Sequence, residues 1–303
     1  MAMVPPPLEI FATPRVSRDA VESSAELTVA QKERRRALVV PREHGAWGML
    51  LVPLMTGVAV GLLAGGRIAP VLLLTTAVLA LFWLRTPAES WLGTGAVRVR
   101  TSQERQLVLR VVAPLATVAV VTLGALFWQG KNGELVWLGM IAGAFFAAQL
   151  LLKRMGSTRM AAEVLGALAL TSTAPAAYCV ATGRLDARAW ALWLMNWLFA
   201  ASQIHFVWLR IRGARAAGPS EKFTLGRSFL AGQIFLGGVL TLACYFNWLP
   251  GLTLLAFAPV LFRGFFWFAS KPQPIEVRRL GWTELAHALV FGVLLTASFY
   301  FVV

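Results

Sequence analysis

The sequence predicts an all-α, polytopic membrane protein. Hydrophobic residues make up 58% of the 303 positions and charged residues only 14%, and the mean hydropathy is +0.67. A soluble domain of this composition would have too much apolar surface to cover. The apolar residues also fall into long runs that recur along the whole chain, which is the pattern of successive membrane helices.

The first apolar run follows directly on three ionisable residues, Arg42, Glu43 and His44. From Gly45 it carries no ionisable residue for about 20 positions. At 1.5 Å per residue this length crosses the roughly 30 Å hydrocarbon core. We therefore expect a transmembrane helix with the three ionisable residues at its mouth, near the headgroups.

Eight further runs follow, so we expect nine transmembrane helices. Together the nine cover about residues 45–63, 68–84, 107–128, 135–152, 161–182, 189–209, 226–246, 249–268 and 281–303.

The basic residues of the chain predict its orientation. On one side the connections contain only Arg67, Lys131, Arg184 and Arg188, whereas the other 24 of the 28 Lys and Arg lie on the opposite side. Because Lys and Arg are retained in the cytoplasm, we expect a cytoplasmic N-terminus and an external C-terminus in the bacterial cytoplasmic membrane.

Residues 1–40 are expected to form a cytoplasmic tail and residues 41–303 the membrane domain. The start of the tail is predicted to be disordered, and residues 16–40 can form a helix on the membrane surface. No cleavable signal peptide is expected. Lys32, Arg34, Arg35 and Arg36 would favour an anionic leaflet. Alternatively, they only prevent translocation of the tail.

The net charge of +14 does not indicate nucleic-acid binding, because the basic residues lie in the gaps between apolar runs. Two cysteines, Cys179 and Cys244, have no metal-binding or redox spacing. They are expected to be small buried hydrophobes, with a disulfide between them left open.

Small residues and prolines predict how the helices pack. Gly57 and Gly61, and likewise Gly139 and Gly143, are four residues apart and would allow close helix contact. Pro175, like three other prolines, falls inside a predicted helix, where it can bend the helix.

Ionisable residues inside a membrane are costly, so their positions are informative. They gather here in the cytoplasmic halves of the predicted helices. The candidate catalytic residues are His44, His205, Glu284 and His287. The candidate ligand-binding residues are Arg42, Glu43, Glu89, Lys153, Arg154, Glu163, Gln203 and Arg210.

Glu284 and His287 are three residues apart and share a helix face. They can form an acid–base pair, a proton relay or half of a metal site. The alternative is that both only make hydrogen bonds that fix the helix packing. A metal site from His44, His205 and His287 is a weaker alternative, because their nitrogens would have to lie about 2 Å from one ion. Haem ligation by two of them is equally weak, because no Cys-x-x-Cys-His attachment motif is present.

The polar residues of different helices are expected to meet at one cavity. A polar group that faces hydrocarbon has no partner, so each should turn toward the bundle centre. We expect His44, Gln203, His205, Glu284 and His287 to border this cavity. Arg42 and Lys153 would lie near its cytoplasmic mouth.

The connection from residue 85 to residue 110 carries five arginines with Glu89 and Glu104. Such a loop can bind an anionic headgroup or a phosphate. Arginines in a cytoplasmic loop can also be present without any ligand.

The stretch PREHGAWGMLLVPLMTG, residues 41–57, resembles the opening motif of the YwiC-like family of bacterial membrane proteins. More remotely, the layout is similar to the UbiA superfamily of intramembrane prenyltransferases, with nine helices and polar connections after the second and sixth. Residues 153–183, KRMGSTRMAAEVLGALALTSTAPAAYCVATG, resemble that superfamily's Lys-Arg turn and the helix after it. This resemblance implies a ring of nine helices around a cytoplasm-facing cavity.

The chain departs from the UbiA pattern where that superfamily holds magnesium. Its enzymes carry two aspartate-rich motifs, because Mg²⁺ requires oxygen ligands. RTPAESW and SQIHFVWLRIR stand at the matching positions here, and the only aspartates are Asp19 and Asp186. Glu89 alone cannot replace two motifs, so magnesium is disfavoured and the cofactor is left open.

The leading hypothesis is a UbiA-like cavity that binds an isoprenoid, quinone or tetrapyrrole-like amphiphile, in a protein that is either a divergent transferase or not an enzyme. One alternative is a transporter with a proton path through Glu163, Glu284 and His287. The other is a non-catalytic assembly factor. The expected partner is a lipid or a lipophilic small molecule, with the oligomeric state open.

Overall fold

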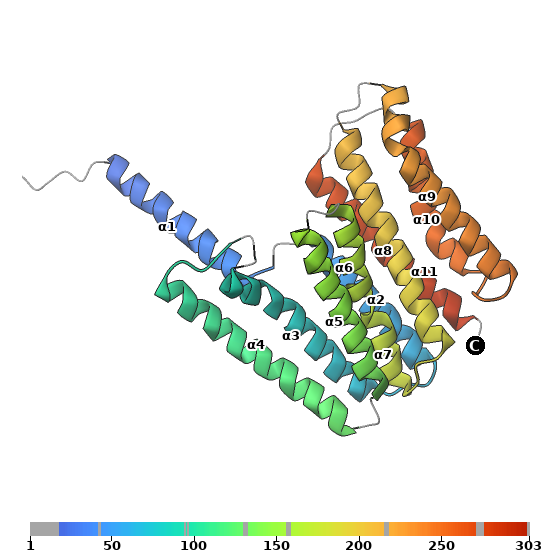
Figure 1. The fold of residues 1–303 in the computed structure, drawn as a ribbon, viewed down its shortest axis with the longest axis horizontal. Helices are drawn as coiled ribbons and strands as arrows, with labels where there is room; N and C mark the ends of the chain where they lie inside the picture. Colours follow the sequence, from blue (N-terminus) through green and yellow to red (C-terminus); the bar gives the residue numbers. More distant parts are fainter. Residues whose placement is uncertain are drawn as a thin grey trace, which may run out of the picture. The chain divides into compact units, whose positions relative to one another are not determined.

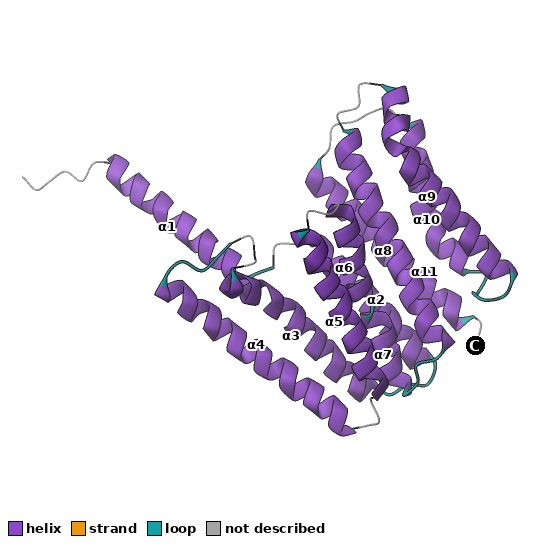
Figure 2. Ribbon diagram, viewed as in Figure 1, coloured by secondary structure: helices purple, strands orange, loops and turns teal. Residues whose placement is uncertain are grey.

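The computed structural model describes residues 18–41, 44–93, 95, 97–129, 133–155, 159–214, 218–270 and 276–301. Over these ranges the chain forms eleven α-helices and no strand (Figure 1 and Figure 2), which confirms the predicted all-α class. The helices are α1 (Arg18–Val39), α2 (His44–Leu63), α3 (Ile68–Leu92), α4 (Ser102–Gln129), α5 (Gly133–Arg154), α6 (Arg159–Thr171), α7 (Thr173–Thr182), α8 (Ala187–Gly213), α9 (Pro219–Tyr245), α10 (Thr253–Ala269) and α11 (Val277–Tyr300).

In the described part of the chain, each of the nine predicted apolar runs coincides for most of its length with a helix, with α6 and α7 sharing one run. Within the described ranges, seven helical stretches are long and apolar enough to cross a membrane. Helix α8 is not among them, since Asn196, Gln203 and His205 lower its hydropathy, and α10 has only 17 residues. The chain is therefore an integral membrane protein.

The chain divides into two compact units, one of residues 1–42 and 83–113 and one of residues 43–82 and 114–303. The first unit contains α1, the end of α3 and the start of α4. Within residues 16–40, where a surface helix was expected, the chain forms α1. Its place on the membrane surface stays a prediction. The stretch expected to be disordered, before residue 18, lies outside the described residues.

In the second unit α2 packs most closely against α7. A methyl group at Gly57 would overlap the backbone carbonyl of Ala174, and one at Gly61 would lie 2.7 Å from Ala181 Cβ. The predicted close contact is confirmed for this glycine pair. It is wrong for Gly139 and Gly143, since a methyl group there would meet nothing within 4 Å.

The run from 161 to 182 is divided at Ser172, where α6 ends and α7 begins, although Ser172 keeps helical backbone angles (φ −59°, ψ −14°). Pro175 has no backbone N–H to bond the carbonyl four residues earlier. The hydroxyl groups of Ser172 and Thr173 bond to the carbonyls of Ala169 (2.7 Å) and Leu170 (2.9 Å). Proline and hydroxyls together therefore account for the interruption of the helical hydrogen bonds at this point.

The packing order of the second unit follows the chain: α7 contacts α8, α8 contacts α9, α9 contacts α10, α10 contacts α11, and α11 contacts α2. Three phenylalanines fill the space between α8, α10 and α11. The rings of Phe199 and Phe291 stack at 3.9 Å, and Phe257 meets Phe291 edge-on at 5.1 Å.

Both cysteines are free thiols. Cys179 is buried, and its Sγ lies 3.5 Å from Glu134 Oε2. Cys244 Sγ lies 3.5 Å from the carbonyl of Pro250. No disulfide therefore links them in this structure.

Candidate functional site: a polar cluster of α8, α10 and α11

Helix α8 carries several polar side chains, among them Asn196, Gln203 and His205. It contacts α2, α6, α7, α9, α10 and α11. Its start is set by Asp186, whose carboxylate accepts the backbone N–H groups of Arg188 (3.0 Å) and Ala189 (3.3 Å). An aspartate at this position satisfies amides that would otherwise have no partner. It thereby fixes which residues of α8 lie within the bundle.

A small cavity lies between α2, α8 and α11. Its volume available to the centre of a water molecule is about 10 Å³, which is room for about one water. Asn196 lines it and donates to Thr56 Oγ1 (3.1 Å) and to the carbonyl of Leu192 (2.8 Å), while its Oδ1 has no partner among the described residues. The lining residues are Gly48, Met49, Val52, Pro53, Asn196, Phe199, Ala200, Gln203 and Ala288.

Gln203 links this cavity to α11. Its side chain is buried, and Nε2 donates to the backbone carbonyl of Glu284 at 2.9 Å. Two of the residues that the sequence placed at one site are thus brought together across α8 and α11.

The Glu284 side chain forms an ion pair with Arg263 of α10, and each side chain is only 12% exposed. The Arg263 guanidinium also lies 4.0 Å above the Phe206 ring of α8. Three atoms of the pair, Arg263 Nε, Arg263 Nη2 and Glu284 Oε1, are buried without a partner in the described part of the chain. A buried ion pair is stable only when such remaining groups are also bonded, so this cluster has unused hydrogen-bonding capacity.

The histidines make other contacts. His205 meets Phe229 of α9 edge-on at 5.2 Å. His287 Nδ1 lies 2.6 Å from the carbonyl of Thr283 in its own helix. His44 begins α2, but its side chain lies outside the described residues, as do Arg42 and Glu43. The described contacts therefore do not gather the histidines at one point.

Glu163 belongs to a second polar group, between α6 and α8. Its carboxylate pairs with Arg159 (3.2 Å) and accepts the indole N–H of Trp208 (2.8 Å). The Arg212 guanidinium lies 5.5 Å from the Trp208 ring. These contacts connect α6 with α8, and they do not indicate that Glu163 binds a ligand.

The other expected ligand-binding residues lie near the helix ends. Glu89 pairs with Arg85 one turn earlier in α3 at 2.8 Å. Lys153 and Arg154 are exposed at the end of α5. Arg210 is half-buried in the last turn of α8. Of these four residues, Arg210 lies close enough to interact with the charges of Glu284 and Arg263.

Two buried cations were not among the site residues expected from the sequence. Arg263 is the only basic residue in the apolar run 249–268, which was the available signal that it needs a partner. Lys222, 3% exposed, bonds to the carbonyls of Trp267 and Ser270 at the end of α10. In the sequence, nothing distinguishes Lys222 from the other basic residues of the connection from 210 to 227.

No group of three His, Cys, Asp or Glu side chains comes together within the described residues. Near Glu284 the described side chains are the Arg263 guanidinium and the Gln203 amide, whose Nε2 donates to the Glu284 carbonyl. The expectation that magnesium is disfavoured stays a prediction.

These helices and their buried polar cluster define a polytopic integral membrane protein. Residues 40–178 match the family model described as YwiC-like protein, so the predicted family resemblance is confirmed over this stretch. No curated protein and no solved structure matches the chain. The cluster of α8, α10 and α11 lies beyond the matched residues.

Proposed function

We propose that this protein binds the polar head of a membrane-embedded amphiphile at the Arg263–Glu284 pair. The supporting observation is that three buried polar atoms of this pair have no partner among the described residues. Leaving a buried polar atom without a hydrogen bond costs about 1–3 kcal/mol, and more for a charged group. A ligand head that bonds these atoms would recover this free energy.

The free atoms indicate the chemistry of the head. Arg263 Nε and Nη2 are donors, and Glu284 Oε1 is an acceptor. A head that carries a carbonyl or carboxylate together with a hydroxyl group would satisfy both. The Phe206 ring, which lies against the Arg263 guanidinium, would pack against the apolar part of the ligand. Quinones with their quinols and tetrapyrrole-like or isoprenoid amphiphiles are the ligand classes that we propose.

Entry of such a head requires movement, because the cavity beside Gln203 holds only about one water. Separation of α8 from α11 would break the bond from Gln203 to the Glu284 carbonyl and open the cluster. We assign no reaction, and catalytic roles for His44, His205, Glu284 and His287 stay predictions.

We further propose that α8 and α10 also cross the membrane, which gives nine spans in a UbiA-like ring. Helix α8 has 27 residues, about 40 Å, and is long enough despite its polar residues. Each helix from α7 to α11 contacts the next one, and α11 contacts α2, which also contacts α7. This sequence of neighbours supports a closed ring. The cytoplasmic N-terminus and the bacterial cytoplasmic membrane belong to this same proposal.

Mass spectrometry of molecules that co-purify in mild detergent tests ligand binding. We expect one amphiphile to be enriched with the wild type and reduced about tenfold or more with Arg263→Gln, because a hydrogen bond to a charged group contributes about 1.5–3 kcal/mol. Arg227→Gln, at an exposed arginine of α9, is the matched control and should retain the molecule. Identical profiles for all three proteins would contradict the proposal.

A proton-linked transporter is the second candidate. It is favoured by His287, one helical turn from Glu284, because a carboxylate and an imidazole can pass a proton. A transporter would acidify or alkalise proteoliposomes when substrate is added, and Glu284→Gln would abolish this. A ligand-binding protein without transport would retain its amphiphile and move no protons.

A further inference from the structure

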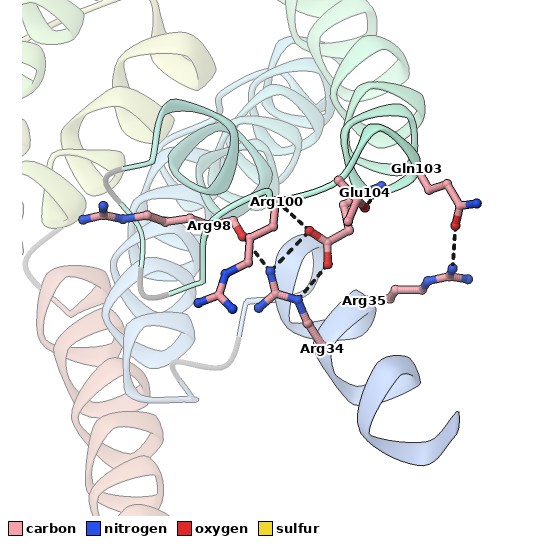
Figure 3. Close-up of polar contacts among 7 residues, drawn as sticks. Arg34, Arg35, Arg98, Arg100, Gln103 and Glu104 are labelled. Atoms are coloured by element: carbon pink, nitrogen blue, oxygen red, sulfur yellow. Dashed lines mark hydrogen bonds and ion pairs between the residues drawn. The ribbon is translucent and has the colours of Figure 1, made fainter. Parts of the chain in front are cut away.

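Helix α1 is held against the connection between α3 and α4 by one arginine. Arg34 Nε and Nη2 bond both oxygens of Glu104, at 2.7 Å and 3.2 Å, and Nη2 also donates to the Arg98 carbonyl at 2.9 Å (Figure 3). The backbone N–H of Arg100 donates to the same carboxylate at 2.7 Å. The hydrogen bond with Glu104 raises the pKa of the Arg34 guanidinium above its ordinary value. Both carboxylate oxygens of Glu104 therefore accept hydrogen bonds from residues of the same unit.

Contacts on both sides fix α1 further. Arg35 Nη2 bonds Gln103 Oε1 at 3.4 Å, and the Trp83 indole donates to the Val39 carbonyl at 3.0 Å. Leu38 is completely buried. The basic end of α1 thus has a defined position beside residues 98–105.

This packing concentrates positive charge. Residues 32–36 and 98–105 contain seven basic and two acidic residues, and Glu104 is already paired with Arg34. Like charges this close repel one another unless an anion lies among them. The exposed basic side chains are Lys32, Arg35, Arg36, Arg98, Arg100 and Arg105.

Large apolar side chains are exposed in the same unit. Trp83, Trp91 and Leu92, all in the last three turns of α3, are 41%, 46% and 70% exposed. Tryptophan is enriched where a protein meets the headgroup region of a bilayer. Trp91 and Leu92 are followed within ten positions by the exposed Arg98 and Arg100, which fits a lipid surface better than a free anion in water.

We propose that α1 and the α3–α4 connection together form a binding surface for anionic lipid headgroups, centred on Arg98 and Arg100. This basic surface belongs to the first unit, and the polar cluster of α8, α10 and α11 belongs to the second. It binds through charge at the membrane interface, with the Arg34–Glu104 pair holding its two halves together.

The test uses the full chain in nanodiscs of phosphatidylcholine with or without 30% phosphatidylglycerol. Native mass spectrometry counts the phosphatidylglycerol retained on wild type and on Arg98→Gln/Arg100→Gln. Near an anionic leaflet each basic residue contributes about 1 kcal/mol, so we expect roughly 30-fold weaker retention by the double variant. Arg98→Lys/Arg100→Lys, which keeps the charge, should retain the lipid and also controls for misfolding.

Arg278→Gln/Arg279→Gln is the matched control, because it removes two exposed arginines at the start of α11. Equal lipid loss from this control would overturn the proposal, since it would mean that any two arginines suffice. Unchanged retention by Arg98→Gln/Arg100→Gln would also overturn it. Displacement of the lipid by 10 mM inorganic phosphate would show a site for free anions instead of lipid.

Discussion

Arg263 and Glu284 combine a buried ion pair with unbonded polar atoms, so each residue depends on the other. Removal of one partner from a buried pair leaves an uncompensated charge and costs about 3–5 kcal/mol. Replacement of both by apolar residues of similar volume is often close to neutral. The two kinds of variant therefore separate packing from function.

We predict that Glu284→Ala lowers the free energy of unfolding by about 3–5 kcal/mol, whereas Arg263→Met/Glu284→Leu loses much less. Thermal unfolding in detergent measures both. If the stable double variant also lost its co-purifying amphiphile, the pair would be needed for binding and not for folding. Equal destabilisation by the single and double variants would contradict the description of this pair.

At the scale of helices, close approach of α2 and α7 depends on Gly57. We predict that Gly57→Ala is destabilising by about 1–3 kcal/mol, because its methyl group would overlap the Ala174 backbone, which cannot move aside. Gly143→Ala is the matched control in α5. It should be neutral or stabilising, since it meets no neighbour and improves helix propensity by about 1 kcal/mol. The midpoint temperature of thermal unfolding should therefore fall in Gly57→Ala and stay the same or rise in Gly143→Ala.

Helix α1 gives a second prediction at this scale. Glu104→Gln removes the carboxylate that binds Arg34, so amide hydrogens of residues 34–39 should exchange faster. Glu89→Gln is the control, because Glu89 pairs with Arg85 within α3. Unchanged exchange in Glu104→Gln would mean that Leu38 and Trp83 hold α1 without the ion pair.

The sequence predicted helices more reliably than their contacts. Nine apolar runs marked the helices because length and hydropathy are local properties. The two glycine pairs look alike in sequence, yet only Gly57 and Gly61 face another helix, since facing depends on the whole packing. For the same reason Gln203 could be expected near Glu284, but the choice of Arg263 as the ion-pair partner required the structure.

At the scale of the whole molecule, orientation rests on the distribution of 24 basic residues on one side and four on the other. We predict that reporters fused near positions 156 and 218 are cytoplasmic and that one after Val303 is external. Fusions to alkaline phosphatase and to a fluorescent protein report the two sides. A cytoplasmic C-terminus would contradict the nine-span proposal.

The central proposal, that an amphiphile head reaches the polar cluster of α8, α10 and α11, is tested most directly by photo-crosslinking. Photo-methionine in place of methionine puts a small reactive group at Met49, which lines the cavity, and at Met55 and Met140, which are 51% and 50% exposed. We predict that Met49 captures an amphiphile that is not a bulk phospholipid and loses it in Arg263→Gln, whereas Met55 and Met140 capture phospholipids. Capture of the same phospholipids at all three positions, or no adduct at Met49, would contradict the proposal.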